Sequence, residues 1–195
     1  MHDIYQFIHA ESIKELQEAT IKFLKGTLNE TNSHFGPPKE ETTLIRTLLI
    51  IINELGCITT DSQPGLIKDD YHQRAYVTML IQKERYDVFK ERMGENVHVK
   101  RLSEELEGDE ILSEEISDFW SKNRYWVSAY FDKKGDFSGK THLGVCEEIN
   151  CASFEDIEIY QELEENYYEI EVVDLEWGRK DLLFRDIIKV LLDFS

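Results

Sequence analysis

The feature that most constrains the fold is an apolar segment near residue 50 that ends at a glycine. Seven Leu and Ile side chains in 39–55 occupy most of the circumference of a helix: Leu44, Ile45, Leu48, Leu49, Ile50, Ile51 and Ile52. A helix that is apolar on most sides is expected to be buried on most sides. Gly56 can end it in a left-handed conformation. The segment therefore predicts a central helix around which the chain packs.

A polar stretch follows this helix. Residues 57–60 are rich in β-branched side chains and predict a short strand. Asp61 and Ser62 can accept hydrogen bonds from nearby backbone amides, and Pro64-Gly65 fits the centre of a type II turn. Such a turn would aim several N–H groups in one direction and cradle a phosphate or carboxylate oxygen. An ordinary tight loop has the same pattern.

The remaining periodicity predicts an α+β fold with a mixed or antiparallel sheet. A capping box at Ser12 begins a helix that Gly26 ends. Residues 73–82 alternate as a half-buried strand does, which places Arg74 beside the expected turn. An amphipathic helix over 179–194 closes the chain. We expect a single domain over 1–195, in which the acidic region 103–165 is a candidate insertion or lobe.

Charge limits the classes of partner. The formal net charge is −18, and residues 102–195 hold 25 of the 40 acidic side chains against 9 basic ones. Nucleic acid and anionic membranes would be repelled, so neither is an expected partner. The acidic half is either a solvated face or a surface for a basic protein partner. With no signal-peptide pattern, no long apolar run and three cysteines that cannot all pair, the expected location is the cytoplasm.

Two kinds of reactive site have weak support. Ser62 or Cys57 could act as a nucleophile with His72 as base and Asp61 as orienting group, but no nucleophile-elbow pattern surrounds either one. Three residues have a spacing that a metal could use but lack Cys-x-x-Cys pairs, so no metal is expected: His142, Cys146 and Cys151. No glycine-rich nucleotide-binding pattern occurs, and no cofactor is expected.

A ligand site is the stronger hypothesis. It would combine neutral hydrogen-bonding groups, a cation for phosphate or carboxylate, and an aromatic ring for stacking. The candidate residues are Thr59, Thr60, Ser62, Gln63, Gln73, Arg74, Trp177 and Arg179. The alternative is structural, because the amide and guanidinium groups could satisfy the chain's own carbonyls and Trp177 could belong to the core.

These residues also carry a resemblance to a known family. The pattern begins with Glu40-Glu41-Thr42 and the apolar helix, and continues with Asn53, Gly56, Thr59-Thr60, Ser62-Gln63-Pro64-Gly65 and Gln73-Arg74-Ala75. It resembles an uncharacterised domain family of actinobacterial proteins, best over residues 10–80, and the tail Asp174–Arg179 can be included. The family has no established activity. The resemblance implies that these residues form a site, and it implies no reaction.

Three functions follow as hypotheses. The first is a small-molecule binding protein, for a nucleotide-derived ligand, with residues 59–65 and Arg74 at its anion-binding edge. The second is a hydrolase or transferase that uses the same pocket. The third is an acidic interaction or immunity protein that binds a basic partner, for which the charge of residues 102–195 is the motive.

Overall fold

The computed structural model describes residues 3–32, 34, 36–94, 97–100, 126–132, 134, 136–142 and 157–194. The helices are α1 (Tyr5–Ile8), α2 (Ile13–Leu24), the 3-10 helix η1 (Glu40–Leu44), α3 (Arg46–Glu54), α4 (Lys83–Met93), α6 (Tyr160–Asn166) and α7 (Leu182–Leu192). The strands are β1 (Ile58–Gln63), β2 (Leu66–Lys68), β3 (Tyr71–Gln82), β4 (Val97–Lys100), β5 (Trp126–Phe131), β6 (Phe137–His142) and β7 (Tyr167–Trp177).

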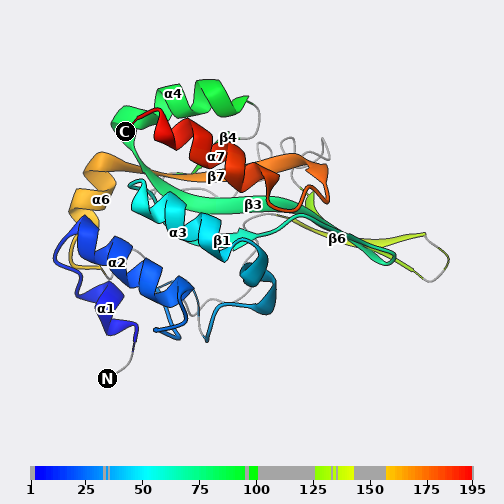
Figure 1. Cartoon of the computed structure of the whole chain (residues 1–195), viewed down its shortest axis with the longest axis horizontal. Helices are drawn as coiled ribbons and strands as arrows, with labels where there is room; N and C mark the ends of the chain where they lie inside the picture. The colour runs from blue at the N-terminus through cyan, green and yellow to red at the C-terminus, as the bar shows by residue number, and fades with distance from the viewer. Residues whose placement is uncertain are drawn as a thin grey trace, which may run out of the picture.

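These elements form an α+β fold in which a layer of helices covers an antiparallel sheet, as predicted (Figure 1). In the helical layer α1 packs on α2, α2 on α3, α3 on α7 and α7 on α4. No described helix has the length and hydropathy that a membrane span requires. The candidate acidic lobe at 103–165 falls largely outside the described residues.

The apolar segment forms the middle of the helical layer, but it is not one continuous helix. The chain forms η1, breaks at Ile45 with φ −118° and ψ −2°, and continues as α3. Ile45, Leu49 and Ile52 are buried, whereas Leu44 is 61% exposed. The prediction of burial on most sides is therefore wrong for η1. A 3-10 turn rotates side chains by 120° per residue rather than 100°, so the apolar face of α3 does not continue through Leu44.

The flanking helices agree better with the sequence. Ser12 caps α2 by accepting a hydrogen bond from the Glu15 N–H, and the Glu15 carboxylate accepts one from the Glu11 N–H. Gly26, with φ +74°, follows the last turn. α7 is amphipathic as predicted: its buried stripe contains Phe184, while Leu182 is 44% exposed.

β3 is the central strand of the sheet. It pairs with β1 and β2 along one edge and with β7 and then β5 along the other, and every pairing among the described strands is antiparallel. β4 joins through β7, and β6 joins through β5. The described sheet therefore depends on β3 for its connectivity.

The expected type II turn centred on Pro64-Gly65 is not formed. β1 and β2 run in line along β3, and the chain reverses later, at residues 69–70. Pro64 and Gly65 form a short interruption between the two strands, and Gly65 does not have a positive φ. Proline is compatible with this interruption, because Pro64 has no cross-strand partner in the β1–β3 or the β2–β3 register.

β3 is also more buried than the alternation suggests. Val77, Met79 and Ile81 are fully buried on one face, and Leu80 is equally buried on the other. Leu80 lies opposite Ile58 of β1, which is 2% exposed. The half-buried prediction is therefore wrong, and the apolar Leu80 among the residues assigned to the polar face was the signal that the prediction overlooked.

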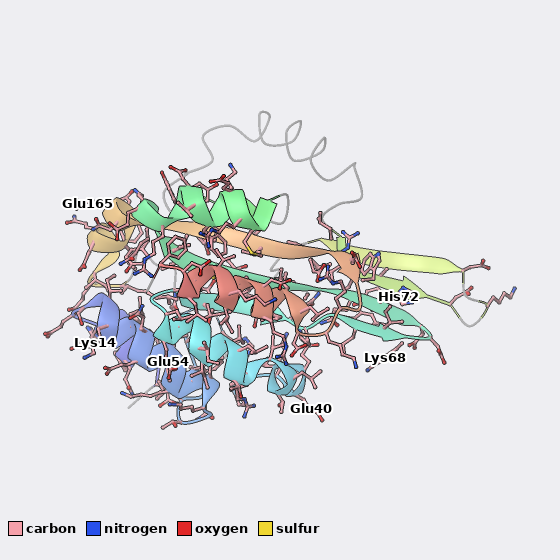
Figure 2. The ribbon with its side chains drawn as sticks, turned by 45° about the horizontal axis from the view of Figure 1, so that its top comes forward. Lys14, Glu40, Glu54, Lys68, His72 and Glu165 are labelled. Carbon is pink, nitrogen blue, oxygen red and sulfur yellow. The ribbon has the colours of Figure 1, made fainter. Side chains whose placement is uncertain are left out.

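One end of the sheet extends beyond the helices. The β2–β3 hairpin and the β5–β6 pair form this extension, which is visible in both views. Figure 2 labels Lys68 and His72 on it, with Glu165 at the opposite end of the molecule. The place where the extension leaves the helix-covered sheet contains most of the candidate ligand site.

Asn53 ties the end of α3 to the sheet. Its side chain is buried, with Nδ2 donating to Leu49 O and Thr59 Oγ1, both at 2.8 Å, and Oδ1 accepting from Thr59 N at 3.1 Å. One amide thus fixes the helix end and the first strand together. Asn53 was noted in the sequence as part of the family pattern, and its role here is structural.

We expect Asn53→Ala to lower the free energy of unfolding by about 2–4 kcal/mol, because it leaves buried polar groups of Leu49 and Thr59 without partners. Urea denaturation measures the change. The matched control is Glu54→Ala, at an exposed position on the same helix, which should stay within about 0.5 kcal/mol of the unaltered protein. Equal effects of the two substitutions would contradict this role.

Candidate functional site

The candidate site lies where β3 changes partners. Arg74 is paired with Trp177 at the end of β7, whereas Gln73 is paired with Ser128 of β5. The β3–β7 register shifts between Arg74 and Tyr76, as at a β-bulge. We call this region, residues 63–65, 73–76, 127–128 and 174–180, the junction.

The junction joins distant segments through backbone hydrogen bonds. Gly65 N donates to Lys180 O at 2.8 Å, and Gly178 N donates to Gln73 O at 3.1 Å. A Cβ on Gly65 would lie 2.9 Å from the backbone nitrogens of both Arg179 and Lys180, so the close approach requires glycine. The structure therefore brings Gln63, Gln73 and Arg74 together with the segment 177–179, as the ligand-site hypothesis requires.

Thr59 and Thr60 are not part of the junction. Thr59 is paired with Met79, five residues from Arg74 along β3, a separation of about 17 Å at a rise of about 3.4 Å per residue. Thr59 bonds to Asn53, and Thr60 Oγ1 donates to Thr78 O at 3.3 Å. Along β1, Ser62 lies between Thr60 and the junction. It is paired with Val77, and its N–H donates to Asp61 Oδ1. The eight predicted residues thus belong to two separate regions.

Gln63 supports the junction from within. Its buried Nε2 group donates to Arg74 O at 2.9 Å and to Val127 O at 3.0 Å. An amide group has two hydrogens, so both are used inside the protein. Gln63 thus provides hydrogen bonds for the Arg74 and Val127 carbonyls at the point where β3 changes partner from β7 to β5.

Gln73 is fully buried in a polar cluster. The Tyr71 hydroxyl donates to Gln73 Oε1 and lies 3.2 Å from Ser128 Oγ. Gln73 Nε2 lies 3.5 Å from a carboxylate oxygen of Glu41, on η1. Burial raises the pKa of Tyr71 above its usual value. The Gln73 amide is therefore held between the sheet extension and η1.

Arg74 stacks on Trp177. The guanidinium carbon lies 4.5 Å from the ring centroid, and the His72 ring lies 6.4 Å from the same indole. Arg74 is 8% exposed, and Trp177 is partly exposed. Burial lowers the pKa of Arg74, and the negative charge of Asp174 opposes that shift. A guanidinium over an indole is a favourable cation–π arrangement that also fixes the ring.

Arg179 and Asp174 form the outer part of the junction. Arg179 Nη1 lies 3.4 Å from Asp174 Oδ1 and 3.6 Å from Glu176 Oε1. These distances exceed the roughly 2.7–2.9 Å of a strong charge-assisted bond, and the Arg179 side chain is 33% exposed. Asp174 is 2% exposed, and burial raises its pKa, while the Glu176 N–H and the Arg179 charge oppose the shift.

The candidate site residues did not include three side chains at or beside the junction: Glu41, Ser128 and Asp174. Glu41 and Asp174 had a signal, because both occur in the segments that carry the family resemblance. Ser128 carried none, since its role arises from the pairing of β5 with β3.

The nucleophile arrangement is excluded by the sheet register. Ser62 is paired with Val77 and His72 with Ile67, so the two lie five positions apart on β3, about 17 Å. The Asp61 carboxylate accepts instead from the Tyr76 hydroxyl at 2.6 Å and from Ser62 N. Cys57 is fully buried, and burial raises its pKa to about 12. A thiol in this state is not activated for attack.

The metal hypothesis falls mostly outside the described structure. Cys146 and Cys151 lie outside the described residues, and the side chain of His142 is not described. Among the described residues, no three His, Cys, Asp or Glu side chains gather as a metal site requires.

Comparison with known families identifies the chain. Residues 4–105 match the model of a domain of unknown function, DUF6919, and the chain belongs to this family. No curated protein matches the chain. The matched segment contains Gln63, Gln73 and Arg74, whereas Asp174, Trp177 and Arg179 lie beyond it. The junction is therefore assembled from the family segment and from the C-terminal part of the chain.

Gly65→Ala should open the junction, because the new Cβ would collide with backbone atoms. We expect a loss of about 1–3 kcal/mol in the free energy of unfolding and faster amide exchange at residue 65 and across 177–180. Gly26→Ala is the matched control, since its Cβ meets nothing within 4 Å and only its φ of +74° is unfavourable. It should leave exchange at 177–180 unchanged; acceleration in both variants would contradict the close approach.

Cys57 should remain unreactive in the folded protein. The unfolded thiol ionises near its ordinary pKa of 9, whereas the folded thiol keeps its proton to about pH 12. Its contribution to stability is complete below pH 9 and declines above it by about 1.4 kcal/mol per pH unit. Alkylation at pH 8 with peptide mapping should label Cys57 only after denaturation, and Cys57→Ala should remove this part of the alkaline loss of stability. Native labelling would contradict the prediction.

Proposed function

We propose that the protein binds a small anionic ligand with a planar ring, such as a nucleotide-derived molecule, at the junction. The observation that carries the proposal is the stacking of Arg74 on a partly exposed Trp177, with the more exposed Arg179 nearby. A planar ring next to a cation is what a phosphorylated aromatic molecule needs from a site. Residues 59–65 are not the anion cradle in this proposal, because the turn that would form it is absent.

Each residue has a distinct role in the proposed site. Trp177 is the platform on which the ligand ring stacks. Arg74 is too buried for extensive contact with a ligand, and it holds the indole in place while adding positive charge. Arg179 is the cation that reaches solvent, and its long contacts to Asp174 and Glu176 leave it able to turn toward a phosphate.

The local charge permits an anionic ligand in spite of the acidic chain. Cations and carboxylates at and beside the C-terminal side of the junction are equal in number: Arg74, Arg179, Lys180 and Arg185 against Asp174, Glu176, Asp181 and Asp186. The local charge is therefore close to neutral, whereas the whole chain carries −18. Charges at contact distance dominate over distant ones in salt, because the Debye length is about 8 Å at physiological ionic strength.

Calorimetric titration of the full chain with AMP, GMP, cyclic nucleotides and ADP-ribose tests the proposal. At least one should bind, and Arg179→Gln should weaken that ligand by about 10- to 100-fold through the loss of a charged hydrogen bond. Lys189→Gln removes the same charge from an exposed position on α7 and should leave the affinity unchanged. Trp177→Leu should also weaken binding, because it removes the platform.

Absence of binding by all of these probes would refute the proposal. Binding that responds equally to Arg179→Gln and Lys189→Gln would place the ligand elsewhere on the protein. Binding of ribose 5-phosphate as tight as that of a nucleotide would show that no ring is recognised.

A further inference from the structure

Asp174 has a carboxylate oxygen without a partner. Oδ1 accepts a hydrogen bond from Glu176 N at 3.0 Å and faces Arg179 Nη1 at 3.4 Å. Oδ2 is buried and has no hydrogen-bond partner in the described part of the chain. Buried polar atoms are nearly always paired, and an unpaired carboxylate oxygen is among the costlier exceptions.

The position of this oxygen relates it to the platform. The negative charge of Asp174 acts to raise the pKa of Arg74, and the Arg74 guanidinium stacks on Trp177. Arg179, the proposed phosphate contact, lies against the other oxygen of the same carboxylate. The unpaired acceptor therefore belongs to the same junction as Trp177, and Asp174 contacts Arg179 there.

Among the described residues, the other buried side-chain oxygens without hydrogen-bond partners lie elsewhere. Gln82 Oε1 and Tyr86 Oη lie near the start of α4, eight or more residues from Arg74. Neither of these two atoms carries a charge. Asp174 is the charged acceptor whose surroundings match the proposed ligand.

We propose that Asp174 Oδ2 accepts a hydrogen bond from an N–H group on the edge of the ligand ring. The site then takes phosphorylated heteroaromatic molecules whose ring carries an amino or imino donor. This inference rests on the proposed function and adds the chemical class of its ligand. Trp177 binds the ring face, Arg179 the phosphate, and Asp174 the ring edge.

Arg179 links the two polar contacts. In the unliganded protein it partly neutralises Asp174, with Nη1 at 3.4 Å from Oδ1. When Arg179 turns to a phosphate, Asp174 loses that cation and gains the ring N–H in its place. A ring without a donor would leave the carboxylate buried and unpaired, and sites built around such a hydrogen bond reject ligands that lack the donor.

Three nucleotides test the inference on the unaltered full chain. AMP and GMP carry N–H donors on the base, and purine riboside 5′-monophosphate carries the same phosphate and a purine ring without one. Calorimetry should show that AMP or GMP binds at least about tenfold tighter than the donor-free nucleotide. This comparison needs no variant and does not depend on one folding correctly.

Asp174→Asn then assigns the preference to this residue. The amide keeps an oxygen for Glu176 N and places an NH₂ group where Oδ2 was, so it nearly conserves shape while exchanging acceptor for donor. The preferred nucleotide should lose about tenfold in affinity, and the donor-free nucleotide should lose nothing. Glu176→Gln removes one charge from a 73% exposed carboxylate beside Arg179 and should retain the preference.

The outcomes separate this inference from the proposed function. If the three nucleotides bind with equal affinity, or if the preference persists in Asp174→Asn, the role of Asp174 is overturned and the proposed function stands. If none of the three binds but ADP-ribose or a cyclic nucleotide does, the role of Asp174 is likewise overturned. If no probe binds at all, both proposals fall.

Discussion

Hydrogen bonding along both edges of β3 is the constraint on which the rest of the structure depends. On one edge β3 holds β1 and β2 in line, and on the other it holds β7 and then β5. β4 and β6 reach the sheet only through β7 and β5. Two collinear partners cannot share one edge without a break between them. That break, with its β-bulge and its displaced carbonyls, is the junction.

The junction concentrates buried polar groups for this reason. A regular ladder satisfies its own N–H and C=O groups, whereas an interrupted one needs side chains to do so. Gln63 supplies two donors to carbonyls of different strands, and the N–H groups of Gly65 and Gly178 bond to Lys180 and Gln73. In the same region Asp174 Oδ2 has no hydrogen-bond partner among the described residues. A structural need thus accounts for most of the predicted ligand residues and leaves Trp177, Arg179 and Asp174 as the group that a ligand could use.

The sequence predicts those parts of the fold that local signals determine. The capping box begins α2, alternation marks β3, and amphipathic spacing marks α7. Pro64-Gly65 misleads because the pair usually means a turn. Here Pro64 lies between β1 and β2, which among the described strands pair only with β3. Gly65 is needed for the close approach of residues 179–180, and no local sequence pattern indicates that approach. Thr59 lies away from the junction for a related reason. It is close to Gln63 in sequence, but the chain between them is an extended strand, which separates the two residues in space.

The acidity of the chain and an anion site can coexist because the two act over different ranges. A polyanion spans many Debye lengths and meets the whole molecule, whose net charge of −18 repels it. A single phosphate at Arg179 meets mainly the charges within a few ångströms, and it would replace Asp174 and Glu176 as a partner of that guanidinium. A site of this kind would therefore admit a free nucleotide and disfavour the same nucleotide within a strand. The acidic surface, whether or not it also binds a basic partner, would contribute to the specificity of the junction by excluding polymeric nucleic acid.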